Sequence, residues 1–223
     1  MRIIIAGATG FVGGAVVRQA IANERITHAF VLTRKPLPED IAKSPKVTII
    51  QHNDFSAYPP ELLEQLAEAE GCVWAIGGRA TQFPDVETAR KVSVDYALAA
   101  ARAFIAGLAP KLPESQKFRF VFCSGKFAEW DQEKSLLWLK DTRRIKGQVE
   151  KGLCDLADAN KDKFEVWAVR PAAILKKYAG LLDTFTANTG GFIDVDKLAK
   201  AMLKIALDGY ADRIVEADAL VKI

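Results

Sequence analysis

The sequence predicts an α/β fold in one domain, with a doubly wound parallel β-sheet that carries helices on both faces. Apolar, β-branched runs alternate with segments of helical periodicity along nearly the whole chain. Most of these runs are continuously apolar, which is typical of parallel strands that are buried on both faces. With 223 residues, the chain is long enough for one sizeable core but short for two full domains. We therefore expect one domain with small additions.

The first 22 residues predict a strand, a tight turn and a helix. Residues 2–6 form a β-branched apolar run, Gly7 to Gly10 interrupt it, and residues 11–22 place apolar side chains at helical spacing. The prolines between the second and third strands, Pro36, Pro38 and Pro45, predict a short crossover without a long helix. Further strands are expected at residues 28–33, 46–50, 72–76, 118–123 and 164–169 and near 213–215, and further helices at 59–70, from Pro84 through 104, at 135–159 and at 194–207.

Three glycines follow the first strand and open the first helix. In dinucleotide-binding proteins the first glycine turns the chain, the second admits the pyrophosphate to the backbone, and the third lets the helix pack on the strand. The helix N-terminus adds the positive end of its dipole to the phosphate site. Because the pattern lies between a strand and a helix, it predicts a Rossmann-type nucleotide site, and the alternative is a tight turn without a ligand. The candidate residues are Gly7, Thr9, Gly10, Phe11, Val12 and Gly13.

The end of the second strand favours NADP(H) over NAD(H). A carboxylate at this position would bind the ribose hydroxyls of NAD and would repel a 2′-phosphate. The sequence instead has Thr33 followed by Arg34 and Lys35. Arg34 can hold a phosphate with two hydrogen bonds and Thr33 can donate its hydroxyl, although a solvated basic turn is the alternative. Asp54, after the third strand, either meets the adenine or forms a turn.

The composition limits the kinds of partner and the location that we expect for this protein. The net charge is +3 and the basic residues are spread along the chain, which favours an anionic small molecule over nucleic acid. The three cysteines, Cys72, Cys123 and Cys154, show no metal-binding spacing, so we expect reduced thiols, a cytoplasmic location and no metal. No apolar run reaches the length of about 18 residues that a membrane span needs. The N-terminal apolar stretch is taken up by the first strand, so no targeting peptide is expected.

Three further segments occur in a characteristic order. They are Ile76-Gly77-Gly78-Arg79 with Val94-Asp95-Tyr96, then Lys146-Gly147-Gln148-Val149-Glu150, then Val169-Arg170-Pro171. With the glycine pattern, they resemble the atypical short-chain dehydrogenase/reductase superfamily over nearly the whole chain. Within it, they are most similar to the Tat-interacting-protein-like and NmrA-like NAD(P)-binding oxidoreductases.

The resemblance implies roles for several residues. Gly77 would contact the cofactor, Ser124 would orient the substrate, and Lys146 would hold the nicotinamide ribose; an ordinary turn and a surface lysine are the alternatives for the last two. The superfamily's catalytic tyrosine lies four residues before the lysine, where this chain has Thr142. A threonine hydroxyl is too weak an acid and too short to replace a phenol simply. Tyr178 is a candidate replacement acid, and packing is its alternative role.

Three functions are compatible with these features. The first is an NADP(H)-dependent oxidoreductase that acts on a small carbonyl or enone with a non-standard proton donor. The second is an NmrA-type sensor in which the bound cofactor shapes a surface for another protein. The third is a non-redox isomerase, dehydratase or cyclase that uses the same pocket. Residues 172–192 are expected to form a substrate-side loop, and the resemblance suggests a monomer or a homodimer.

Overall fold

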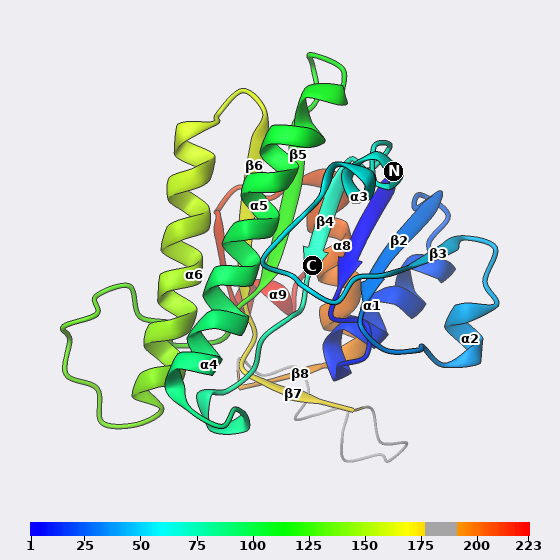
Figure 1. Ribbon diagram of the computed structural model, residues 1–223. Coiled ribbons are helices and arrows are strands. Elements are labelled where there is room, and N and C mark those ends of the chain that lie inside the picture. The colour runs from blue at the N-terminus through cyan, green and yellow to red at the C-terminus, as the bar shows by residue number, and fades with distance from the viewer. Residues whose placement is uncertain (177–190) are drawn as a thin grey trace.

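The computed structural model describes residues 1–176 and 191–223, and a parallel sheet forms its centre (Figure 1). Seven strands follow the order β3-β2-β1-β4-β5-β6-β9, which confirms the predicted doubly wound α/β fold. The strand order reverses at β1, which β2 and β4 flank, and such a switch point opens a crevice at the carboxyl ends of the strands. The strands are β1 (Arg2–Ala6), β2 (His28–Thr33), β3 (Val47–Gln51), β4 (Gly71–Trp74), β5 (Phe118–Cys123), β6 (Phe164–Arg170) and β9 (Ile214–Glu216).

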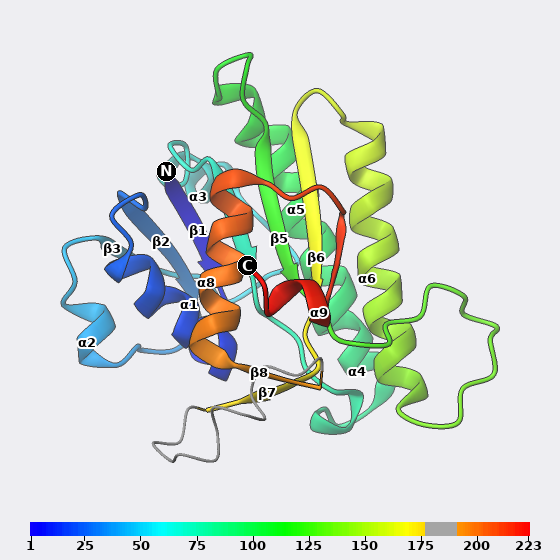
Figure 2. The ribbon, with the colours of Figure 1, turned by 180° about the vertical axis from the view of Figure 1, so that it is seen from behind.

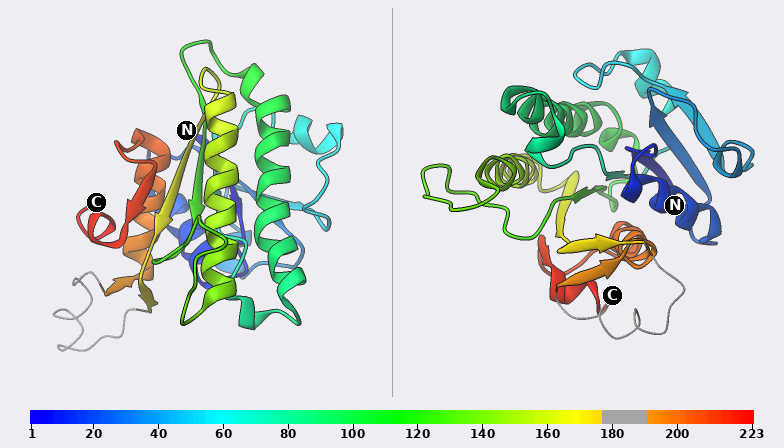
Figure 3. Two further views of the ribbon diagram at one scale, coloured as in Figure 1. Left: turned by 90° about the vertical axis from the view of Figure 1, so that its left-hand side faces the viewer. Right: turned by 90° about the horizontal axis from the view of Figure 1, so that it is seen from below.

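Helices cover both faces of the sheet (Figures 2 and 3). Alternate residues of a strand point to opposite faces, so Ile4 belongs to the core on one face of the sheet whereas Ile3 and Ile5 belong to the core on the other. One face carries α1 (Phe11–Ala22), α8 (Val195–Asp208) and α9 (Ala217–Leu220), and the other carries α3 (Pro60–Gln65), α4 (Val86–Arg90), α5 (Tyr96–Gly107) and α6 (Lys140–Ala159). The second crossover contains only the short helix α2 (Glu39–Ala42), as the prolines predict.

Helix α6 begins at Lys140 and not at residue 135. The residue before it, Leu139, has φ 47°, a left-handed conformation through which an α-helix does not continue. Residues 126–139 therefore form a loop that extends beside the start of α6, yellow-green in Figure 1. Leu137 in this loop is 99% exposed. The end of α3 also differs from the prediction, because it lies at Gln65 and not at residue 70.

The helix predicted from Pro84 begins at Val86, where Asp85 caps it. The Oδ1 of Asp85 accepts a hydrogen bond from the N–H of Thr88 at 2.6 Å, as an N-cap does. The helix then widens into a π-helical segment, η2 (Lys91–Asp95), before α5 begins. Apolar spacing alone does not predict this wider turn.

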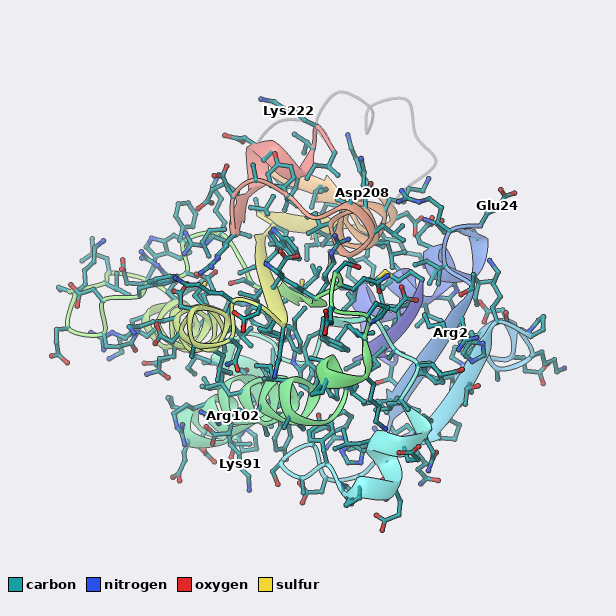
Figure 4. The ribbon with its side chains drawn as sticks, turned by 90° about the horizontal axis from the view of Figure 1, so that it is seen from above. Arg2, Glu24, Lys91, Arg102, Asp208 and Lys222 are labelled. Atoms are coloured by element: carbon teal, nitrogen blue, oxygen red, sulfur yellow. The ribbon has the colours of Figure 1, made fainter. Side chains whose placement is uncertain are left out.

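Among the helices that the structure describes, one stretch, Val86–Lys111, is long enough and apolar enough to cross a membrane, judged by length and composition alone. Its apolar side is used inside the fold, because Ala97, Ala100 and Phe104 are fully buried against the sheet. Lys91 and Arg102 lie on the outer side of the same helix (Figure 4). Burial of this kind is typical of a core helix. The expectation that no segment spans a membrane stays a prediction.

A second, small sheet follows β6 and was not predicted. Strand β7 (Ala173–Leu175) pairs in parallel with β8 (Phe192–Asp194), and Ile174 lies opposite Ile193. Asp194 then caps α8, as expected, by accepting hydrogen bonds from the N–H groups of the second and third residues of that helix. The two strands border the expected substrate-side loop, and Tyr178 within it lies outside the described residues.

Candidate cofactor and active site

A cleft of about 250 Å³ opens at the carboxyl ends of β1, β2 and β4, where the strand order reverses. Six of the residues predicted to bind the cofactor line it, namely Gly7, Thr9, Gly10, Thr33, Arg34 and Gly77. The residues from β1, β2 and β4 are far apart in the sequence and meet only because these strands are neighbours in the sheet. The cleft is therefore the place where the predicted nucleotide site assembles.

Two of the predicted glycines are required by the backbone path. Gly7 has φ 91°, and a Cβ at this position would lie 2.6 Å from the carbonyl carbon of Ala75. A Cβ on Gly13 would lie 2.1 Å from the carbonyl oxygen of Gly7, so α1 approaches the turn as closely as only glycine permits. Gly10 is the N-cap residue of α1 and provides no side-chain cap. The first turn of the helix, which contains Phe11 and Val12, has no acidic residue. The exposed amide groups of this helix end suit a pyrophosphate.

Thr33 shapes the basic wall of the cleft. Its hydroxyl donates to the carbonyl oxygen of Lys35 at 2.8 Å and accepts from the N–H of Lys35 at 3.2 Å, which folds the chain around Arg34. Arg34 and Lys35 are exposed and both line the cleft, whereas no carboxylate does so among the described residues. This charge pattern suits a phosphate better than free ribose hydroxyls.

Asp54 does not line this cleft. Its Oδ1 accepts hydrogen bonds from the N–H of Ser56 at 2.9 Å and from the Ser56 hydroxyl at 2.5 Å, and these bonds lower the pKa of Asp54. The side chain therefore forms the turn that was the alternative to an adenine contact.

Aromatic residues complete the cleft and were not predicted from the sequence. Phe55, Phe83 and Tyr96 line it beside Val92. Phe55 also packs edge-on against Trp74, with ring centroids 5.9 Å apart, which links the cleft wall to the core. The only sequence signal for Phe55 is an apolar residue in a polar segment directly after a strand.

Ser124 and Lys146 meet at the carboxyl end of β5. The Nζ of Lys146 donates a hydrogen bond to the carbonyl oxygen of Ser124 at 2.7 Å. Burial lowers the pKa of Lys146, although the nearby Cys123 and Glu150 act in the opposite direction. Burial also raises the pKa of the Cys123 thiol, which fits a structural strand residue better than a nucleophile. The structure thus brings together two of the residues that the sequence predicts to take part in catalysis.

Comparison with known proteins identifies the family of this chain. Residues 7–208 match the family model described as NAD(P)H-binding. The chain belongs to this NAD(P)H-binding family. This result confirms the resemblance to NAD(P)-binding oxidoreductases of the short-chain dehydrogenase/reductase type that the motifs indicated.

One curated relative of the family is the Leucinostatins biosynthesis cluster protein T of Purpureocillium lilacinum, which is 32% identical over 126 residues. That alignment covers 56% of this chain and 42% of the relative, so the chain spans less than half of that protein. Among solved structures, Gre2 of Candida albicans in complex with NADPH has a TM-score of 0.72 at 18% identity, covering 97% of this chain and 78% of the other. The oxidoreductase ylbE of Lactococcus lactis has a TM-score of 0.67 at 16% identity, covering 100% and 96%. These two structures show the shared fold.

In this family member, the position of the superfamily's tyrosine has a structural role. Thr142 is only 7% exposed, and its Oγ1 accepts a hydrogen bond from the N–H of Ala80 at 2.8 Å. Ala80 opens the short helix η1 (Ala80–Gln82), directly after the loop that contains Gly77. The threonine hydroxyl therefore links the start of η1 to α6.

A buried carboxylate organises the other side of this region. Glu150 is fully buried, and its Oε1 accepts a hydrogen bond from the hydroxyl of Ser124 at 2.5 Å. Its Oε2 accepts one from the indole N–H of Trp130 at 2.7 Å, and Arg170 donates to both oxygens, at 2.9 and 2.5 Å. The hydrogen bonds that Arg170 donates to Glu150 raise the pKa of Arg170, which keeps the guanidinium charged. Sequence reasoning recognised Glu150 only as part of a motif and missed these contacts.

The loop of residues 126–139 is tied to α6 beside this network. A Cβ on Gly147 would lie 1.7 Å from the carbonyl oxygen of Glu129, so the helix can approach the loop only because residue 147 is glycine. Asp131 accepts hydrogen bonds from the N–H groups of Glu133 and Lys134, which makes it a turn residue. Trp130 is 39% exposed and is tied to α6 by the hydrogen bond that its indole N–H donates to Glu150.

Proposed function

We propose that this chain binds NADP(H) in the cleft at the switch point and transfers hydride between the nicotinamide and a small carbonyl or enone substrate. The observation that carries the cofactor preference is the basic wall of Arg34 and Lys35, with no carboxylate among the described cleft residues. A 2′-phosphate on the adenosine ribose would pair with this wall, whereas the hydroxyls of NAD would find no carboxylate there.

The residues around β5 support the reaction. The glycine turn would hold the pyrophosphate, and the Lys146 ammonium would bind the nicotinamide ribose from the end of β5. When bound, the nicotinamide supplies or accepts a hydride, so the chain or a water molecule must supply or accept the proton. Thr142 is not available for this step because it is buried against Ala80. Tyr178, in the segment after β7, is our candidate for the proton donor.

A second function is favoured by one specific observation. Ser124, whose carbonyl oxygen accepts from Lys146, already donates its hydroxyl proton to Glu150, and the hydroxyl of Thr142 belongs to a side chain that is only 7% exposed. This arrangement suits a protein that binds NADP(H) without turning it over, such as a regulatory protein whose cofactor is a ligand. A non-redox enzyme that uses the same pocket is the third possibility.

Titration with the two reduced cofactors tests the proposal. Nicotinamide fluorescence on adding NADPH and then NADH to the purified protein gives both dissociation constants, and a panel of small aldehydes, ketones, enones and quinones then tests turnover. We expect tighter binding of NADPH, and turnover that is lost in both Lys146→Ala and Tyr178→Phe. Tight binding with no turnover on the whole panel would favour the regulatory function. Binding of neither nucleotide would refute the proposal.

A further inference from the structure

The cofactor cleft has a buried hydroxyl behind its wall that no group in the described structure satisfies. Ser93 is 4% exposed, and its Oγ is a buried polar atom with no hydrogen-bond partner. Buried hydroxyls are almost always hydrogen-bonded, because removing them from water without a partner is unfavourable. An unpaired hydroxyl next to a ligand cleft is explained if the ligand brings the partner.

The π-helical segment η2 determines where this hydroxyl lies. Val92 and Tyr96 of this region line the cleft, and Val94 is buried in the core, so Ser93 lies between the two surfaces. A π-helical turn changes the direction of the side chains that it carries, and such turns are frequent at functional sites. The wider turn thus brings Ser93 to the rear of the cleft.

Gly77 is the neighbour that Ser93 faces. Gly77 lines the cleft and has φ 135°, a conformation that favours glycine. If Gly77 carried a Cβ, its nearest atom would be the Oγ of Ser93, at 3.4 Å. Because residue 77 has no side chain, nothing from that residue fills the space between its backbone and the hydroxyl.

We propose that Ser93 is a further cofactor-binding residue, whose hydroxyl forms a hydrogen bond with the nicotinamide-side half of NADP(H) beside Gly77. The strand order indicates the nicotinamide-side half. Strands β2 and β4 lie on opposite sides of β1, so Gly77, after β4, lies across the glycine turn from Arg34, after β2. A hydroxyl can donate to a phosphate or ribose oxygen and can accept from a ribose hydroxyl. The inference rests on the proposed binding of NADP(H) in this cleft.

The substitution Ser93→Ala removes only the hydroxyl. It should not destabilise the free protein, but it should weaken the binding of NADPH. Because the hydroxyl has no partner in the free protein, the unfolding midpoint of the free variant should equal or exceed that of the wild type. The dissociation constant for NADPH should rise about threefold to thirtyfold, because one ligand hydrogen bond is lost. A merely structural serine would instead lower the unfolding midpoint and leave the affinity unchanged. Ser93→Thr, which keeps the hydroxyl, should bind NADPH within about threefold of the wild type.

Adenosine 2′,5′-bisphosphate, the adenosine half of the cofactor, serves as the matched probe. Ser93→Ala should leave its affinity within about twofold of the wild type, whereas Arg34→Ala should weaken the binding of both this fragment and NADPH. Unchanged NADPH affinity in Ser93→Ala would overturn the inference, and so would an equal loss for both ligands. If the wild type binds neither ligand, the proposed function fails and this inference fails with it. If the wild type binds NADPH but Ser93→Ala binds it equally well, only this inference fails and the proposed function stands.

Discussion

The side chains at the end of β5 determine which proton movements are available to this protein. The hydroxyl proton of Ser124 is donated to the buried carboxylate of Glu150 at 2.5 Å. A hydroxyl that donates to a carboxylate can still accept a hydrogen bond through its lone pairs. Ser124 is therefore set up to accept from a substrate hydroxyl or a water molecule. Donation to a substrate carbonyl would require it to leave Glu150.

Arg34 is the residue on which we expect the proposed cofactor preference to depend. We expect Arg34→Ala to weaken NADPH binding by about tenfold or more, because a charge-assisted contact with the 2′-phosphate is lost. NADH has no such phosphate, so its affinity should change by less than about threefold. Arg25→Ala is the control, since this exposed arginine pairs with Asp208. Fluorescence titration of both cofactors measures the difference, and an equal loss for both would contradict the assignment.

If Lys146 binds the cofactor as proposed, it should give the affinity a pH dependence. Burial lowers its pKa from the usual 10.5, so the ammonium loses its proton at a lower pH than a free lysine does. If the charged form binds the ribose, NADPH affinity should decline as the pH rises toward 10, beginning below the pKa of free lysine. Lys146→Arg should move this decline to higher pH, because a guanidinium stays charged. The same decline in Lys146→Ala would show that another group is responsible.

At the scale of elements, the sequence predicts the helices, strands and turns whose signals lie within a short stretch of residues. The strand-turn-helix unit of β1 and α1 has its apolar spacing and its glycines within 22 residues, and the structure matches it. The short second crossover follows from three prolines in the same way. The start of α6 could not be predicted, because the apolar residues 136–139 run directly into the helix and the left-handed conformation of Leu139, which ends the loop, leaves no signal in the sequence.

Features that depend on distant partners were missed. Glu150 receives its hydrogen bonds from Ser124, Trp130 and Arg170, each 20 or more residues away, and no local pattern records these contacts. The same holds for the cleft wall of Phe55 and Phe83, which come from segments after two different strands. Their positions result from how the elements pack.

The network of Glu150 should hold the loop of residues 126–139, α6 and β6 together. We expect Glu150→Gln to lower the free energy of unfolding by about 3–5 kcal/mol, because Arg170 is then a largely buried cation whose one remaining ion pair among the described residues is with Glu216. Asp158→Asn, which breaks an exposed pair with Arg213, is the control and should have a much smaller effect. Urea unfolding measures both variants. An effect of Glu150→Gln no larger than that of the control would show that the network contributes little to stability.

At the scale of the molecule, the cofactor cleft joins segments that are distant along the chain. The glycine turn after β1, the basic turn after β2, the end of β4 and the segment η2 all contribute to it. These segments lie together only in the folded sheet. A dinucleotide that contacts all of them therefore binds the native state and has no equivalent site in the unfolded chain.

This difference predicts that NADPH stabilises the protein against heat. At a concentration one hundred times the dissociation constant, the native state gains about 2.7 kcal/mol, which for a chain of this length raises the unfolding midpoint by about 5–10 °C. NADH at the same concentration should give a smaller shift, and Arg34→Ala should reduce the difference between the two cofactors. Differential scanning fluorimetry measures these shifts without any turnover, so the result holds for an enzyme and for a regulatory protein alike. Equal shifts for NADPH and NADH would refute the preference for NADP(H), and no shift with either would place the cofactor site in doubt.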